Sequence, residues 1–183
     1  MKNNSSEWKA VIGLEVHVQL NTKTKMFTSS EWGYGESPNT QICPVTLGYP
    51  GTLPTINSLA VKKGISIGLS LDCNINKVTK FARKHYFYPD LPKGYQISQF
   101  NDPLCENGYI ELLNHDNKKV NIVRAHLEED AGKTIHSLEG NALIDYNRAG
   151  APLLEIVSGP DMSSAAEAID YLNSLKEIIV ELN

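Results

Sequence analysis

Three adjacent carboxylates, Glu128, Glu129 and Asp130, lie between His126 and Lys133 in the sequence. Like charges this close repel one another unless a cation or water screens them. Magnesium prefers carboxylate oxygens and leaves coordination positions open for phosphate, so the segment is a candidate site for a hard cation. The competing interpretation is an acidic turn in solvent, which is the usual role of a short run of charges.

Residues 11–20 carry a second group of polar side chains. Apolar and polar residues alternate along this segment, and a period of two predicts a strand with one apolar face. The opposite face carries Glu15, His17 and Gln19, which are close enough in sequence to approach a common ligand. An antiparallel sheet with one face in water would carry the same residues, so both interpretations stay open here.

Glu155 is a single carboxylate inside the apolar run of residues 153–157, which is predicted to be a short strand. A polar connection is expected between residues 133 and 142, before this strand is reached. A charge in a buried strand costs several kcal/mol unless it has a partner. Arg148 would provide that partner through an ion pair, and a cation shared with the carboxylates of residues 128–130 is the alternative.

Basic residues and tyrosines interleave over residues 80–90 and 93–100. Such a surface can bind a phosphate or stack on a flat ring. A strand whose aromatic side chains fill the core, with lysines that extend to the solvent, would show the same pattern. The candidate contacts are Arg83, Lys84, Tyr86, Tyr88, Lys93 and Tyr95.

A β-hairpin is predicted to lead into the acidic segment. Residues 108–113 and 119–124 are strand-like and are joined by a polar tip. If the second strand continues, Glu128 shares a face with Arg124 and His126. The other face of the strand then points into the core and carries Val123, Ala125 and Leu127.

This continuation separates the three carboxylates from one another. Because neighbouring residues of a strand point to opposite faces, Glu128 is the expected inward ligand. Glu129 or Asp130 is then expected to stay in solvent.

Two helices are predicted from capping residues and spacing. The first begins at Asn57 or Ser58 and runs to about Cys73. The second opens with a capping box formed by Ser164 and Glu167. Its apolar stripe is expected to consist of Ala165, Ile169, Leu172, Leu175, Ile179 and Leu182.

Composition places the chain among ordinary globular proteins. It has 183 residues, of which 41% are hydrophobic and 21% charged, so one domain, or one domain and a small further part, is expected. The net charge of -4, with no long Lys/Arg block, argues against a broad nucleic-acid groove. We expect a soluble intracellular protein without a membrane partner, because no apolar run approaches the length of a membrane span. The three cysteines are scattered and form no disulfide framework.

Taken together, the motifs resemble one known family, the B subunit of the bacterial and organellar glutamyl/aspartyl-tRNA amidotransferases. The resemblance covers nearly the whole chain from Lys9 onward. It is carried by long blocks that align almost without gaps. These blocks are residues 11–20, 86–99, 126–133 and 145–158.

The resemblance implies an α+β fold, in which a largely antiparallel β-sheet forms a cradle with flanking helices, as in glutamine synthetase. Residues 1–183 would be the front portion of the catalytic domain. On this resemblance, we expect the helical domain and the C-terminal tRNA-contacting tail of the family to lie outside these residues. The second predicted helix continues to the end without a glycine or proline stop signal, which also indicates a fragment of a longer protein.

The family activity implied is an ATP- and magnesium-dependent amidation. The side-chain carboxylate of a misacylated Glu-tRNA(Gln) or Asp-tRNA(Asn) is phosphorylated, and ammonia then displaces the phosphate to give Gln-tRNA(Gln) or Asn-tRNA(Asn). The ammonia comes from glutamine through a partner amidase (A) subunit, and a small C subunit completes a heterotrimer.

Two alternatives to this activity stay open. One is a truncated, non-catalytic fragment that binds only partners or tRNA. The other is the archaeal E subunit, which is disfavoured because this chain has no room for the large inserted domain of that subunit. The expected compartment is the bacterial cytoplasm, and an organellar matrix stays open.

Site residues are carried over from the family by position. His17, Glu128 and Glu155 match the magnesium site, and Glu15 would support it. The remaining catalytic candidates are Glu129 and Asp130, as further ligands or on the ammonia path, and Lys133 as a phosphate contact. The candidates for ATP and phosphate are Arg83, Lys84, Tyr86, Tyr88, Lys93 and Tyr95.

One departure from the family pattern lies in the loop-rich residues 28–57. Many members carry two cysteine pairs there that bind zinc. In this chain Thr28, Ser30 and Thr46 occupy three of those positions, and Cys43 is the one cysteine left. We therefore predict no structural zinc.

Overall fold

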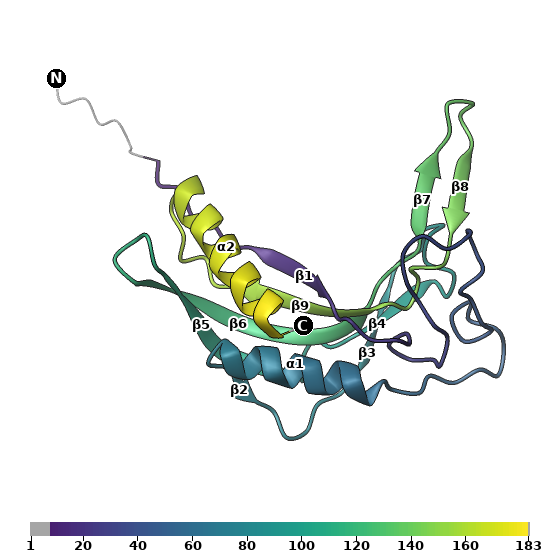
Figure 1. Ribbon diagram of the computed structural model, residues 1–183, viewed down its shortest axis with the longest axis horizontal. Helices are drawn as coiled ribbons and strands as arrows, with labels where there is room; N and C mark the ends of the chain where they lie inside the picture. Colours follow the sequence, from purple (N-terminus) through teal and green to yellow (C-terminus); the bar gives the residue numbers. More distant parts are fainter. Residues whose placement is uncertain (1–7, 183) are drawn as a thin grey trace.

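The computed structural model describes residues 8–182, and its centre is a five-stranded antiparallel sheet (Figure 1). The spatial order is β1-β9-β6-β5-β2, so the first and the last strands of the chain are neighbours. The strands are β1 (Glu15–Gln19), β2 (Asn74–Ile75), β5 (Cys105–Leu112), β6 (Lys118–Glu129) and β9 (Pro152–Ser158). The expected α+β class with a largely antiparallel sheet is confirmed.

Two helices, α1 (Ser58–Ser70) and α2 (Ala165–Leu182), accompany the sheet. The carbonyl oxygen of the Asn57 side chain accepts hydrogen bonds from the N–H groups of Leu59 and Ala60, at 3.0 and 3.2 Å, and so caps α1 as predicted. The helix ends at Ser70, three residues before the predicted Cys73. Gly64 lets α1 approach the sheet closely, because a Cβ there would lie 2.9 Å from a methyl of Leu104.

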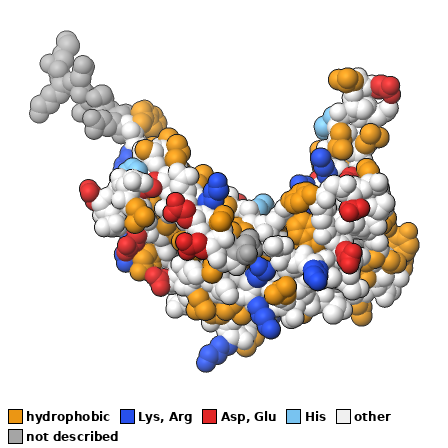
Figure 2. Space-filling model, in the orientation of Figure 1, with side chains coloured by type: hydrophobic (Ala, Val, Ile, Leu, Met, Phe, Trp, Pro, Cys, Tyr) orange, Lys and Arg blue, Asp and Glu red, His pale blue; other side chains and the backbone are white. Residues whose placement is uncertain are grey.

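Two small hairpins extend the structure beyond the main sheet. One pairs β3 (Ala82–His85) with β4 (Tyr95–Ser98), and the other pairs β7 (Lys133–His136) with β8 (Ala142–Asp145). The expectation of a polar connection between residues 133 and 142 is wrong. Ile135 and Leu143 are register partners in this second hairpin, which projects from the body with exposed apolar side chains (Figures 1 and 2).

A β-bulge in β6 changes which residues face the core. Strand β6 continues to Glu129 as predicted, but the register shifts between Ile122 and Arg124. The extra residue, Val123, is 47% exposed, so its prediction as a core residue is wrong. Ala125 and Leu127, after the bulge, are buried as predicted.

The apolar stripe predicted for α2 is only partly correct. Leu175 is buried, but Ile169 and Leu172 are exposed, because the helix turns the fully buried Tyr171 toward the core. The capping box is shifted as well. The Ser164 hydroxyl accepts from the N–H of Glu167, while the Glu167 carboxylate accepts from Ser163 at 2.6 Å.

Among residues 8–182 no helix has the length and apolar character that a membrane span requires.

Candidate metal and phosphate site

Three neighbouring strands place polar side chains in one row. On the register of the main sheet, His17 of β1 is the partner of Glu155 of β9, and Glu155 is the partner of His126 of β6. Glu128 follows His126 by two residues and therefore points to the same face of the sheet. His17 and Glu155 are 138 positions apart in the chain, and they meet the residues of β6 because β9 lies between β1 and β6.

The ligand atoms of His17, Glu128 and Glu155 lie within 4.8 Å of one another. The Nε2 atom of His17 is 2.9 Å from Oε2 of Glu155 and 3.2 Å from Oε1 of Glu128. Both carboxylates are buried, whereas the imidazole is half-exposed. The structure therefore brings together the three residues that were matched to the magnesium site.

The environment of Glu128 favours its ionised form. Burial raises its pKa, but hydrogen bonds from His126 and from the Ser98 hydroxyl, at 3.0 Å, and the charges of His126 and His17 lower it. The net effect is a pKa below the usual range of a glutamate. A carboxylate that stays charged while buried is suited to bind a cation.

The donor set fits a divalent cation. In an octahedral magnesium site with bonds of about 2.1 Å, adjacent ligand atoms lie about 3 Å apart, which is close to the two distances from His17. In the described part of the chain, Oε1 of Glu128 is buried without a hydrogen bond, which a cation would satisfy. The two carboxylates suit magnesium or manganese, while the imidazole also suits zinc.

A cavity of about 470 Å³ opens over this cluster. Its lining includes Arg83 and Lys84 from β3 and Ser98 from β4. Positive side chains close to a cation site would complement a phosphate-bearing ligand. The charged and imidazole groups that line the cavity are Glu15, Arg83, Lys84, Arg124, His126, Glu128 and Glu155.

The prediction that Glu129 or Asp130 stays in solvent is wrong, because their side chains are only 5% and 17% exposed. Glu129 forms an ion pair with Lys93, which is also buried. It also accepts a hydrogen bond of 2.9 Å from the N–H of Ile97. Both Glu129 and Lys93 line a separate small cavity of about 70 Å³, together with Tyr95.

Asp130 is the ion-pair partner of Arg148, which had been considered as the partner of Glu155. The Nε atom of Arg148 lies 3.4 Å from Asp130, and the same guanidinium donates to the carbonyl oxygens of Ala131 and Gly132. The interpretation of an Arg148–Glu155 ion pair is therefore wrong, because the Arg148 side chain contacts the residues directly after β6. Burial raises the pKa of Asp130 despite the charge of Arg148 and a hydrogen bond from Gln19.

The other predicted contacts are spread over three places. Tyr86 and Tyr88 are exposed in the connection between β3 and β4. Tyr95 lies under the guanidinium of Arg83, at 4.4 Å from its ring centre. Lys133 begins β7 on the projecting hairpin.

Two residues of the cavity received no role from the sequence. Arg124 and His126 line it, and His126 lies directly behind the cluster, with Nε2 at 3.6 Å from Glu128. The alternation of strand faces could have identified them, since both were placed on the same face of the strand as Glu128.

The loop that was compared with a zinc site surrounds the Cys43 thiol with three hydroxyl groups, here called the hydroxyl cage. They belong to Thr28, Ser30 and Thr46. The Sγ atom of Cys43 is 3.4 Å from the hydroxyl of Thr46 and accepts from its N–H at 3.5 Å. Burial would raise the pKa of Cys43, but these bonds and those from Ser30 and Thr28 lower it to about 6. That no structural zinc binds here stays a prediction, which elemental analysis of the purified protein would test.

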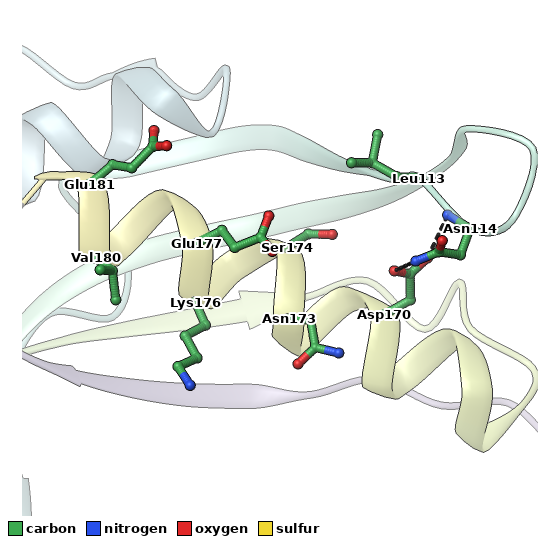
Figure 3. Close-up of a pocket in the computed structure, with 9 residues that line it drawn as sticks. All are labelled: Leu113, Asn114, Asp170, Asn173, Ser174, Lys176, Glu177, Val180 and Glu181. Atoms are coloured by element: carbon green, nitrogen blue, oxygen red, sulfur yellow. Dashed lines mark hydrogen bonds between the residues drawn. The ribbon is translucent and has the colours of Figure 1, made fainter.

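A larger groove lies away from the cluster, between α2 and the tip of the β5–β6 hairpin (Figure 3). Its volume is about 550 Å³, and most of its lining residues are polar, with Asp170, Glu177 and Glu181 as the acidic ones. At one end Asp170 accepts hydrogen bonds of 3.0 and 2.7 Å from Asn114 (Figure 3). These bonds tie the hairpin to α2.

A family model described as "GatB/GatE catalytic domain" matches residues 10–183 of this sequence. The chain belongs to this family. The His17, Glu128 and Glu155 cluster and the cavity above it are thus features of a GatB/GatE catalytic domain.

The chain is also similar to curated members of the family. It is 54% identical over 176 residues to the B subunit of the aspartyl/glutamyl-tRNA(Asn/Gln) amidotransferase of Coxiella burnetii (strain Dugway 5J108-111), covering 94% of this chain. It is 56% identical over 172 residues to the protein of the same name from Finegoldia magna, covering 93% of this chain. The chain spans 37% and 36% of the length of these two relatives.

Proposed function

We propose that this chain forms the carboxylate-phosphorylating site of a glutamyl/aspartyl-tRNA amidotransferase. The substrate is the side-chain carboxylate of misacylated Glu-tRNA(Gln) or Asp-tRNA(Asn), and the products are Gln-tRNA(Gln) or Asn-tRNA(Asn). The observation that carries the proposal is the cluster of His17, Glu128 and Glu155 beneath a cavity with basic side chains. The names of the relatives support the choice of substrate.

The chemistry explains why such a site is needed. A carboxylate is a poor electrophile, so one of its oxygens first takes the γ-phosphoryl group of ATP, and ADP leaves. The nitrogen of ammonia then attacks the carbonyl carbon, the C–O bond to phosphate breaks, and the nitrogen loses a proton. Phosphoryl transfer requires mainly positioning and neutralisation of charge, and magnesium supplies part of that neutralisation when bound.

The residues divide these tasks. His17, Glu128 and Glu155 hold the cation, and Glu15 on the same face of β1 supports them. Arg83 and Lys84, which belong to β3, bind phosphate oxygens through their positive charges. Lys133 and the tyrosines of residues 86–95 are further candidate contacts for the ligand.

Ammonia must reach the site unprotonated and shielded from water. Glu129 and Asp130 follow the cation ligand Glu128 directly, and both are held by basic partners. We assign them to the side from which ammonia arrives. The proposed partners are an amidase subunit and a small C subunit in a heterotrimer, together with the misacylated tRNA, in the bacterial cytoplasm or an organellar matrix.

The test is the ATP-dependent conversion of Glu-tRNA(Gln) to Gln-tRNA(Gln) in the assembled enzyme, with ammonium as nitrogen donor. Glu128→Gln should lower the rate by roughly a hundred-fold or more, because it removes a charged ligand at the phosphorylation step. Glu111→Gln, which changes an exposed carboxylate of β5, is the control and should leave the rate unchanged. Full activity of Glu128→Gln would refute the site, and a wild-type complex that binds tRNA without turnover would indicate a binding module.

A further inference from the structure

The β-bulge at Val123 turns Arg124 toward the candidate site. Before the bulge, Val120 and Ile122 face the core, and after it Ala125 does. Without the extra residue, Arg124 would continue the even-numbered series and point into the core. Bulges commonly re-aim one side chain beside an active site.

The register places Arg124 one row away from the cation cluster. Arg124 pairs with Val157, which pairs in turn with Glu15, and the next row contains His17, Glu155 and His126. Residues two apart on a strand are separated by about 7 Å. Arg124 therefore stands about this far from the cluster, on the same face and in the lining of the same cavity.

One nitrogen of the Arg124 guanidinium has no partner in the described part of the chain. Its Nε atom is buried and has no hydrogen-bond acceptor among residues 8–182. The guanidinium carbon lies 5.6 Å from the ring centre of Phe100, which also lines the cavity. A buried donor without an acceptor is costly, and the fork of a guanidinium matches the oxygens of a phosphate.

We propose that Arg124 binds the β-phosphate of ATP, which is not transferred in the reaction, while the γ-phosphate lies at the cation cluster. This inference rests on the proposed function. A polyphosphate is an anion long enough to contact the cluster and a side chain one row away. Arg124 then positions the nucleotide and takes no part in proton or phosphoryl transfer.

The test measures dissociation constants by calorimetry for ATP, ADP and AMP with magnesium, on the wild-type protein and on Arg124→Gln. The expected result is a roughly ten- to hundred-fold rise in Kd for both ATP and ADP, because each contains the β-phosphate. AMP lacks this group, and its Kd should not change. Arg124→Lys keeps the charge and should recover part of the affinity.

One control separates nucleotide binding from a general effect of charge. Lys119→Gln removes a positive charge from the same strand, and the Lys119 ammonium lies over Tyr109, outside the cavity. Every Kd of this variant should equal that of the wild type. A structural role of Arg124 would instead raise the Kd of AMP together with those of ATP and ADP in Arg124→Gln, and that result would refute the proposal.

The outcomes also separate this inference from the function on which it rests. Equal ATP affinity of Arg124→Gln and wild type would overturn the role of Arg124 and leave the proposed function standing. A loss for ATP with no loss for ADP would move the contact to the γ-phosphate and overturn the β-phosphate assignment. A wild-type protein that binds no magnesium nucleotide would overturn both.

Discussion

The Nε2 atom of His17 lies 2.9 Å from Oε2 of Glu155, and the two residues are direct partners across β1 and β9. Glu128 approaches the same nitrogen from β6, at 3.2 Å. One imidazole between two buried carboxylates is an arrangement that a divalent cation would stabilise, since it neutralises both charges. All three residues lie on strands of the main sheet, so the strand pairing fixes the distances between them.

Glu155→Gln should weaken the binding of divalent cations by at least about ten-fold, because an amide oxygen replaces a charged ligand. The imidazole should also make zinc bind more tightly than magnesium. Titration calorimetry with each ion measures both effects, and Glu36→Gln, in an exposed loop, is the control. Unchanged affinity in Glu155→Gln would remove this residue from the cation site.

Local pattern alone predicts much of the frame that carries this cluster. The alternation before and after His17 predicts β1, and Asn57 marks the start of α1. The proximity of His17 and Glu155 is different, since it depends on a strand pairing between residues 138 positions apart. The grouping of His17 with Glu155 came from the resemblance to a family, because no local pattern in the sequence predicts this strand pairing.

The errors have physical causes of the same kind. The bulge at Val123 interrupts the pairing of β6 with β9, while the pairing of β6 with β5 keeps its register. A strict period of two in the sequence cannot show such an extra residue. Helix α2 contains more apolar residues than one face can bury, and the fully buried Tyr171 decides the rotation. Glu129 or Asp130 was expected in solvent from the alternation of strand faces, and that pattern does not show that Lys93, from a distant hairpin, is the partner of Glu129.

Lys93→Met should lower the free energy of unfolding by about 3–5 kcal/mol, because it leaves the buried Glu129 carboxylate without a counter-charge. Adding Glu129→Gln to this variant should restore most of the loss, since no buried charge then remains. Urea unfolding of the two single variants and the double variant measures the coupling. Strictly additive losses would show that the two side chains do not stabilise each other.

Gly108→Ala should destabilise the fold by at least about 2 kcal/mol through steric overlap. A Cβ at this position would lie 2.2 Å from the carbonyl oxygen of Leu71, which is backbone, and 2.4 Å from Sγ of Cys73. Gly33→Ala is the matched control, because the nearest atom to its added Cβ is a side-chain nitrogen at 3.9 Å. Thermal unfolding of the two variants should show a lower Tm in Gly108→Ala alone, and equal Tm values would contradict the close packing of β5 against the end of α1.

Cys43 should react with iodoacetamide at a rate that rises as the pH increases through about 6, because the thiolate is the nucleophile and the pKa of this thiol is lowered to about 6. Thr46→Val removes a hydroxyl that stabilises the thiolate and should move the midpoint to higher pH. Cys73 and Cys105 are internal controls, since burial raises their pKa values to about 11 and 12 and they should stay unlabelled in the folded protein. Mass spectrometry of labelled peptides between pH 5 and 9 distinguishes the three thiols, and a midpoint near 9 for Cys43 would show that the hydroxyl cage does not stabilise its thiolate.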